Sequence, residues 1–409
     1  MNKVIDKEKN ETLVSRYKFG TQYIPDYDEF KLQVLNKTII PYQVEIQPPP
    51  RGKKICWLDC PYCYGASAED TGDRFDKERC LKVLEEIADG GVKKIIFAGY
   101  ATDPLNSSYI DDLLELVINR GQIFGFNTKA LKVSERFINL LSREDIVKDS
   151  YVSVSVDAGS VEVYNAVHAV KSKAKIYDKV LKNVQNMGKA RVESGKAFDI
   201  SVTYLIEGHN NTPEEVEAFI KDFKSAGANL LRFTFAQPPR DFETGDGIIP
   251  SVDEKEQYSN LLRPIIEKHN TADCPILLID ADSEHGIFYK PRTLPCIARW
   301  TYPTVGFDGW LYHCSQSSSP NFRSMALGDL SKNGFWELFY NYNAENIHEY
   351  FSEYSKKMAD ASCRCDRKEH VVNSGVKTSG VFNVEFNKIT DENISKWSEQ
   401  ETVPIPLDP

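Results

Sequence analysis

The sequence predicts an α/β fold: a partial (β/α)6 barrel of the TIM type, followed by a small Cys-rich C-terminal extension. Two observations predict it. Short runs rich in β-branched residues alternate with amphipathic helical stretches, and seven of the nine cysteines fall into two separate groups. Strands that alternate with helices form βαβ units around a parallel sheet. The six runs expected to be strands are residues 42–46, 93–99, 122–128, 151–158, 198–206 and 230–236.

The stretches between these runs carry helix signals. Amphipathic patterns cover residues 76–91, 107–121 and 212–228. In the last of these, Thr212 is expected to cap the helix, with Glu215 three residues on and Pro213 in the first turn. In a barrel of this type, the loops that leave the carboxyl ends of the strands carry the chemistry. Functional residues are therefore expected in those loops.

Composition limits the classes of partner. The chain has 409 residues, 41% hydrophobic and 27% charged, with a formal net charge of −10. It contains no apolar run long enough to span a membrane, and its basic residues are scattered rather than clustered, which argues against nucleic acid. The N-terminus lacks the apolar segment of a secretory signal. We therefore expect a cytoplasmic protein whose partners include neither nucleic acid nor membrane.

The segment "ICWLDCPYCYG" places three cysteines in a short loop after the first expected strand. Cys56, Cys60 and Cys63 have the spacing C-x3-C-x2-C. In a reducing compartment, clustered thiolates indicate a soft metal rather than disulfides. Three thiolates can hold three irons of a [4Fe–4S] cluster and leave the fourth iron open. A zinc knuckle is the alternative, but structural zinc needs four closed ligands, and no Cys or His follows at knuckle spacing.

The motif resembles the signature of the radical S-adenosylmethionine (SAM) superfamily, in which an aromatic residue, here Tyr62, precedes the third cysteine. The resemblance implies that Cys56, Cys60 and Cys63 bind a [4Fe–4S] cluster whose open iron chelates the amino and carboxyl groups of SAM. It also implies reductive cleavage of SAM to a 5′-deoxyadenosyl radical, which abstracts a substrate hydrogen. An electron donor such as flavodoxin or ferredoxin is implied as a partner.

The resemblance implies further SAM contacts, residue by residue. The family's Gly-Gly-Glu-Pro stretch corresponds to "AGYATDPL", which has a single glycine and an aspartate before the proline. "YLIEGHNN" resembles the family's G-x-I-x-G-x-x-E, with Asn211 in place of the acid. Period-two alternation puts Ser153, Ser155 and Asp157 on one face of the fourth strand. For each position, ordinary barrel packing or a capping turn is the alternative. The implied SAM-binding residues are Tyr62, Gly99, Asp103, Asn127, Ser153, Ser155, Asp157, Ile206 and Arg232, with Lys129 close by.

The second cysteine group resembles the SPASM/Twitch extension of the same superfamily. Cys296 and Cys314 flank a "FDGW" turn expected to form a β-hairpin, and Cys363 and Cys365 follow an "ALGDL" segment. Four cysteines can ligate one cluster completely, so the resemblance implies one auxiliary [4Fe–4S] cluster of the Twitch type, held by these four residues. Because the C-x-C end is tight, one of that pair could be spare. A structural zinc ribbon is the alternative. Cys80 and Cys274 stand outside both groups and are expected in the core.

Five segments follow from these assignments. They are an N-terminal segment (1–41), the barrel (42–240), a bridging region (241–290), the Twitch/SPASM-like auxiliary cluster domain (291–370) and a C-terminal tail (371–409).

The expected reaction follows from the ligand count. A cluster with four cysteine ligands has no open iron, so its expected role is electron transfer, which favours net oxidation of the substrate. The segment before the barrel is too short for the winged-helix leader-binding domain of many peptide modifiers. We therefore expect a small polar biosynthetic intermediate, derived from a sugar, aminocyclitol or amino acid. The alternatives are a ribosomally made peptide as substrate, or a non-catalytic iron–sulfur scaffold or sensor.

Overall fold

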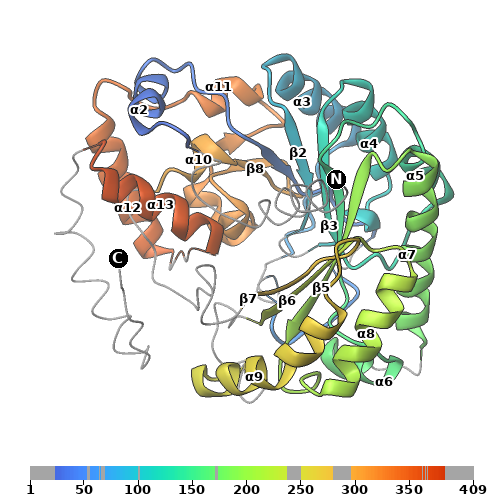
Figure 1. Ribbon diagram of the computed structural model, residues 1–409. Coiled ribbons are helices and arrows are strands. Elements are labelled where there is room, and N and C mark those ends of the chain that lie inside the picture. Colours follow the sequence, from blue (N-terminus) through green and yellow to red (C-terminus); the bar gives the residue numbers. More distant parts are fainter. Residues whose placement is uncertain are drawn as a thin grey trace, which may run out of the picture.

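The fold is built around one continuous ten-stranded sheet (Figure 1). The computed structural model describes residues 24–52, 56–63, 65, 70–99, 102–170, 174–236, 250–279, 296–361, 363, 365 and 367–382. Within them the strand order is β10-β9-β8-β1-β2-β3-β4-β5-β6-β7, and β1 to β7 are parallel to their neighbours. These seven strands are β1 (Val44–Ile46), β2 (Lys94–Phe97), β3 (Ile123–Thr128), β4 (Ser150–Ser155), β5 (Phe198–Ile206), β6 (Leu230–Phe235) and β7 (Ile276–Ile279). The partial α/β barrel predicted from the sequence is confirmed.

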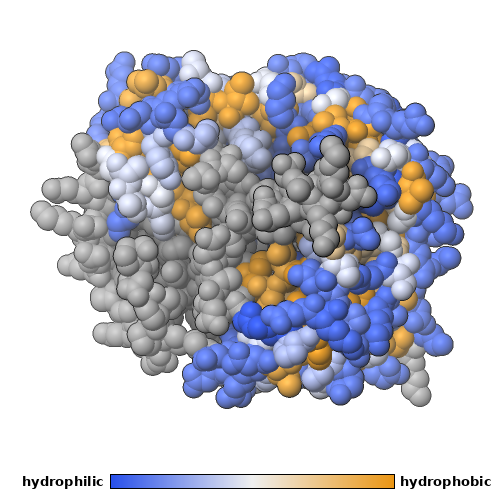
Figure 2. Space-filling view, in the orientation of Figure 1, coloured by the Kyte–Doolittle hydropathy of each residue, from blue (hydrophilic) through white to orange (hydrophobic). Residues whose placement is uncertain are grey.

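Helices cover the outer face of the parallel strands, and Figure 2 shows that the exposed side of this layer is mostly hydrophilic. The inner side of the layer is apolar, and aromatic rings from strands and helices meet there. Phe126 on β3 contacts Phe137 on α5 at 5.1 Å between ring centroids, and Phe233 on β6 contacts Phe219 on α8 at 5.4 Å. The helices before and between the strands are α2 (Tyr27–Leu35), α3 (Lys77–Asp89), α4 (Ile110–Asn119), α5 (Glu135–Leu141), α6 (Val161–Val167), α7 (Ile176–Glu193), α8 (Pro213–Ser225) and α9 (Val252–His269).

The predicted cap of α8 is wrong in its detail. Thr212 does occupy the N-cap position and Pro213 begins the helix, but the Thr212 side chain makes no capping hydrogen bond. The Glu215 carboxylate instead accepts hydrogen bonds from Gly159 N (2.5 Å) and Ser160 Oγ (3.1 Å), just before α6. A capping box would offer the Glu215 carboxylate one backbone N–H, that of Thr212. The loop before α6 offers it two donors, one N–H and one hydroxyl, and the carboxylate binds these instead.

The barrel extends further than the six predicted strands. Residues 241–290 were expected to bridge two domains, but α9 and β7 within this range form one more helix–strand unit. β7 pairs in parallel with β6, with Leu231 opposite Ile276. The short run "PILLI" lacks the length of the other strands, and only its pairing with β6 identifies it. Cys274, just before it, is buried as expected.

The C-terminal elements join the same sheet at its other edge. They are α10 (Ala298–Thr301), β8 (Thr304–Val305), β9 (Trp310–Tyr312), β10 (Gly328–Asp329), α11 (Phe335–Phe339), α12 (Ile347–Asp360) and α13 (Arg367–Ser379). The predicted hairpin is present, since β8 and β9 are antiparallel. In addition, β8 pairs in parallel with β1, with Ile46 opposite Val305. The extension is therefore continuous with the barrel, and the boundary predicted at residue 370 falls inside α13. The rest of the predicted tail, from residue 383, lies outside the described residues.

The hairpin turn depends on Gly309. Its φ is +81°, and a Cβ added there would lie 2.6 Å from Cδ2 of the buried Phe75. We predict that Gly309→Ala lowers the free energy of unfolding by about 2–4 kcal/mol, from the left-handed backbone and the clash together. The matched control is Gly121→Ala, where φ is also positive (+63°) but nothing lies within 4 Å of the added carbon. It should cost about 1 kcal/mol. Equal losses in urea unfolding would contradict the packing argument.

Candidate active site

The inner face of the parallel strands is polar. Asn127 on β3 is in register with Ser153 on β4, and Ser155 is in register with Thr203 on β5, which in turn lies opposite Arg232 on β6. Neighbours in parallel register share a face of the sheet. These residues alternate with Phe126 and Phe233, which pack against the helices, so they face the inside of the barrel.

Three of these side chains reach open space. Asn127 is exposed and Ser155 and Arg232 are half-buried, whereas Ser153 is buried. Ile206 lies on the other face of the sheet. It shares the parity of Tyr204, whose ring contacts Phe219 on α8, and its side chain is buried in the outer core.

The three-cysteine loop packs against the carboxyl ends of these strands, as predicted. Cys60 is buried, and its Sγ lies 3.1 Å from Nδ1 of His168, at the end of α6. Tyr62 is also buried, and its hydroxyl donates a 3.0 Å hydrogen bond to the carboxylate of Asp157, just past β4. Burial and the Asp157 charge raise the pKa of Tyr62 well above its ordinary value, so the phenol stays protonated. The motif is thereby fixed to the end of the fourth strand.

Asp157 is the centre of a buried polar network. Its carboxylate pairs with Lys129 Nζ at 2.6 Å and accepts from Leu205 N at 2.8 Å. Burial works to raise its pKa, but Lys129 and these hydrogen bonds outweigh it and hold the pKa below the ordinary value. Its φ of +62° breaks the strand alternation, and β4 ends at Ser155. Asp157 therefore follows the strand rather than belonging to it, and its carboxylate lies beside Lys129 and Tyr62.

Two predicted residues at the end of β2 shape the neighbouring loop. Asp103 is buried and accepts hydrogen bonds from Thr128 Oγ1 (2.8 Å), Lys129 N (2.6 Å) and Leu105 N (2.9 Å). It thus ties the loop after β2 to the end of β3. At Gly99 an added Cβ would lie 1.9 Å from the carbonyl oxygen of Thr102, so the turn admits no side chain.

Sequence reasoning missed three buried polar residues of this network. They are His168, Glu207 and Asn210, which are fully buried. Asn210 donates to the carbonyl oxygen of Asp157 at 2.8 Å and accepts from Glu207 N at 2.8 Å. No spacing connects these residues to the cysteine motif. Asn210 and Glu207 lie inside "YLIEGHNN", where the resemblance directed attention to Ile206, Gly208 and Asn211 instead.

His168 is held as a neutral ring. Burial and the charge of Lys129 lower its pKa to about 3, against the opposing effect of Asp157. Its Nε2 lies 3.0 Å from the carbonyl oxygen of Val156, which can only accept, so Nε2 carries the proton. Nδ1 is then an acceptor, and the Cys60 thiol is placed to donate to it. The free thiol form of the loop is therefore stabilised by a specific hydrogen bond.

This histidine predicts a pH dependence of stability for the protein without bound metal. When the pKa of a histidine is lower in the folded protein than in the unfolded chain, the unfolded chain takes up a proton first as the pH falls. The free energy of unfolding is therefore highest above the unfolded pKa and decreases as the pH falls toward the folded pKa. The window runs from about 6.5 down to about 3. Between pH 7 and 5, His168→Gln should therefore lose about 2 kcal/mol less unfolding free energy than the parent. His348→Gln, at an exposed site, should keep the parent's decline. Identical urea-unfolding slopes in all three proteins would contradict the assignment.

The three thiols of the loop suit a cluster. Burial raises the pKa of Cys60 to about 12, Lys129 counteracts it, and charges on Cys63, Asp157 and Cys56 add to it, so the thiols are near enough to interact. Among the described residues, no three His, Cys, Asp or Glu side chains are arranged to hold a single metal ion. A cubane cluster distributes its cysteine ligands over separate irons. Three cysteine thiols in one loop are donors that can each ligate a separate iron of such a cluster.

The second cysteine group also comes together. Burial, and after it the charges of Glu369, Cys363 and Cys296, raises the pKa of Cys314 well above its ordinary value. Cys296, Cys314 and Cys363 are buried, whereas Cys365 is half-buried. A hydrogen bond from the backbone N–H of Ile297 to Asn373 Oδ1 joins the segment that carries Cys296 to α13, 76 positions further along the chain. Cys80, in contrast, lies on the buried face of α3, as expected.

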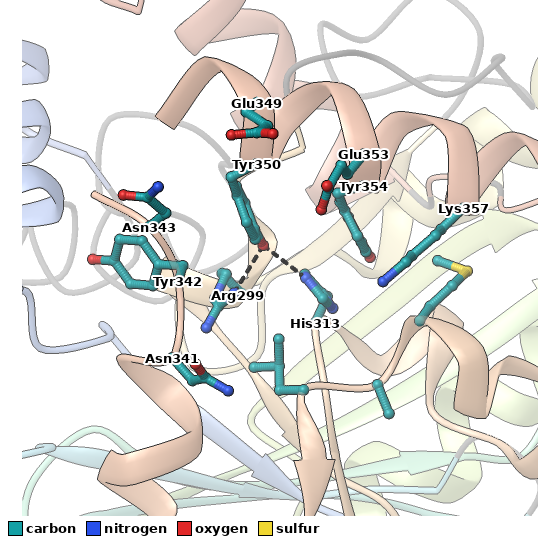
Figure 3. A pocket seen from close by; sticks show the side chains of 13 residues that line it. Arg299, His313, Asn341, Tyr342, Asn343, Glu349, Tyr350, Glu353, Tyr354 and Lys357 are labelled. Carbon is teal, nitrogen blue, oxygen red and sulfur yellow. Dashed lines mark hydrogen bonds between the residues drawn. The ribbon is translucent and has the colours of Figure 1, made fainter. Parts of the chain in front are cut away.

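A pocket of about 400 Å³ lies beside this second group (Figure 3). The Tyr350 hydroxyl accepts from Arg299 at 2.9 Å and lies 2.9 Å from His313 Nε2, as the dashed lines show. His313 directly precedes Cys314, and its ring stacks on Tyr354 at 3.8 Å between centroids. Glu349, Glu353 and Lys357 of α12 line the pocket as well. Both stacked rings line the pocket, and Tyr354 is close enough to Cys296, Cys363 and Cys314 to feel their charges.

Fold and site define a TIM-type α/β barrel with a three-thiol loop at the carboxyl end of its first strand. Residues 53–223 match the family model of the Radical SAM superfamily. The chain thus contains a radical SAM domain, and the resemblance noted in the cysteine motif is confirmed. No curated protein sequence is significantly similar to the chain. No helix in the described part of the chain is both long and apolar enough to cross a lipid bilayer.

Solved structures with similar folds include two that contain bound S-adenosylmethionine. SuiB of Streptococcus suis bound to S-adenosylmethionine has a TM-score of 0.54 at 15% identity, covering 78% of this chain and 70% of that one. The anSMEcpe protein with bound AdoMet has a TM-score of 0.54 at 17% identity, covering 88% and 96%. SuiB bound to the precursor peptide SuiA has a TM-score of 0.51 at 14% identity, covering 76% and 68%. At these identities the likeness concerns the fold.

Proposed function

We propose that this protein is a radical SAM oxidoreductase that modifies an unactivated C–H bond of its substrate. The observation that carries the proposal is the contact of the Cys56, Cys60 and Cys63 loop with the carboxyl ends of β3 and β4, inside a radical SAM domain. A [4Fe–4S] cluster on these cysteines would supply the electron that cleaves SAM into methionine and a 5′-deoxyadenosyl radical. A flavodoxin or ferredoxin of the cytoplasm is the proposed source of that electron.

The residues around the loop have proposed roles in holding SAM. Asn127, Ser155 and Arg232 present accessible polar groups to the barrel interior, and Ser153 stands behind them. Gly99 allows the backbone of Thr102 to approach closely and so shapes the turn after β2, and Asp103 fixes that turn. Asp157 and Lys129 hold Tyr62, and through it the cysteine loop, in place. Ile206 contributes through its backbone, since its side chain is in the outer core.

The second cysteine group is proposed to hold an auxiliary [4Fe–4S] cluster. Its support is that Cys296, Cys314 and Cys363 are buried and interact, and that Cys365 contacts Asn373, which also binds the backbone next to Cys296. When bound, this cluster would be able to accept one electron from the substrate radical that remains after hydrogen abstraction. The substrate thus loses a hydrogen atom to the 5′-deoxyadenosyl radical, followed by one proton and that electron. Net oxidation is the proposed outcome.

The proposed substrate is a small polar biosynthetic intermediate derived from a sugar, aminocyclitol or amino acid. Its support is that the inner face of β3 to β6 is polar beyond the proposed SAM contacts, since Thr203 on β5 lies between Ser155 and Arg232, which suits a polyhydroxylated or zwitterionic molecule. A ribosomally made peptide is the second candidate, favoured by the structural neighbour that was solved with a precursor peptide. A non-catalytic scaffold is disfavoured by the intact cysteine motif.

Turnover in deuterated water tests the reaction type once a substrate is identified. Oxidation gives a product lighter by two hydrogens, with no solvent deuterium at the attacked carbon. An epimerase gives a product of unchanged composition that carries one deuterium there, delivered by a thiol. That label would contradict the oxidation proposal while leaving SAM cleavage intact.

A further inference from the structure

A fully buried amide, that of Asn373 on α13, connects the two ends of the second cysteine group. Its Oδ1 accepts a 2.9 Å hydrogen bond from the backbone N–H of Ile297, the residue after Cys296. Its Nδ2 lies 3.7 Å from Cys365 Sγ and donates to it. The side chain has no exposed surface. A single residue therefore contacts both the loop that carries Cys296 and the sulfur of Cys365.

The orientation of this amide is fixed by chemistry. A backbone N–H can only donate, so the atom that faces Ile297 N must be the amide oxygen. The amide nitrogen, with its two hydrogens, is left facing the sulfur. A donor in this position suits a sulfur that carries negative charge, which is the form in which cysteine binds iron.

The rest of α13 supports the same arrangement. The helix packs against α10, which begins just after Cys296. Glu369 lies one turn before Asn373 on the same face of the helix and is buried. Its charge contributes to raising the pKa of Cys314, after burial, so this face of α13 is turned toward the cysteines. The helix therefore closes one side of the group.

We propose that Asn373 is a positioning residue of the auxiliary centre: it holds Cys365 in place as the fourth cysteine ligand and stabilises the reduced centre through its N–H. The proposal rests on the proposed function, in which this group binds a cluster. It makes Cys365 a ligand rather than a spare thiol, although Cys365 is the least buried of the four. An N–H···S hydrogen bond favours the more negative, reduced state and so raises the reduction potential.

Asn373→Asp removes the donor to the sulfur and adds a carboxylate beside it, and both changes are expected to make the reduction potential more negative. The aspartate keeps an acceptor for Ile297 N but replaces the donor to sulfur with an oxygen. The matched control is Asn270→Asp, at an exposed asparagine whose Oδ1 also accepts a backbone N–H, from Ile276. Both variants are made in the full chain with Cys56, Cys60 and Cys63 replaced by alanine, so that only the auxiliary centre is loaded with iron and sulfide. The reduction potential is then measured by EPR-monitored redox titration.

The expected result is a more negative potential for Asn373→Asp and no shift for Asn270→Asp. An unchanged potential for Asn373→Asp would overturn the proposal. Loss of auxiliary iron at an unchanged melting temperature of the iron-free protein would support the positioning role, whereas loss of iron with a lowered melting temperature would reduce Asn373 to a structural residue.

Cys365→Ser should alter the EPR spectrum, unlike Cys80→Ser, and an unaltered spectrum would also refute the proposal. If the parent binds no auxiliary iron at all, the proposed auxiliary cluster is wrong, and the role proposed for Asn373 is wrong with it.

Discussion

Replacing Cys60 by alanine should abolish the formation of 5′-deoxyadenosine from SAM, and Cys56→Ala and Cys63→Ala should do the same. Each variant removes one of only three thiolates available to the cluster in this loop. The iron content of the reconstituted protein should fall from about eight to about four atoms, because the auxiliary group is untouched. Liquid chromatography of the nucleoside products, after reduction with dithionite, measures the effect.

The control for this series is Cys80→Ala. Cys80 is buried like Cys60 but lies on α3, outside the loop, so the Cys80→Ala variant should retain SAM cleavage. Circular dichroism should show that all four variants are folded. Undiminished 5′-deoxyadenosine from any of the three loop variants would contradict the assignment of the motif.

The second large effect concerns the auxiliary group. Replacing Cys296 and Cys314 together should leave about four irons in the reconstituted protein and retain at least part of the SAM cleavage, while substrate oxidation is lost. The physical reason is that each proposed centre has its own set of cysteines, so the two centres are expected to load independently. Inductively coupled plasma mass spectrometry distinguishes the metals. Zinc at this site, or only four irons in the parent protein, would contradict the proposal.

The barrel was predictable because its signals are local. β5 matches its predicted range, Phe198–Ile206, and the hairpin at "FDGW" forms where glycine permits a positive φ. The cysteine loop was predictable from its own spacing. In each of these cases the residues that determine the structure are close together in the sequence, so a local sequence pattern is enough to predict it.

The misses share a different cause, since each depends on a partner that is distant in the sequence. Strand β7 is too short to be recognised without β6, and Glu215 leaves its expected cap for donors before α6. The buried contact of His168 with Cys60 joins residues 108 positions apart. The contact of Asn373 with Ile297 spans 76 positions. Such contacts depend on how the helices and strands pack together, and a local sequence pattern does not predict them.

The central claim is that the three-thiol loop supports reductive cleavage of SAM. The most direct measurement is the yield of 5′-deoxyadenosine and methionine from anaerobically reconstituted, full-length protein, with and without reductant. We predict both products in equal amounts, only with the reductant present, and in catalytic excess once the substrate is supplied. A fully iron-loaded, reduced protein that leaves SAM intact would contradict the account.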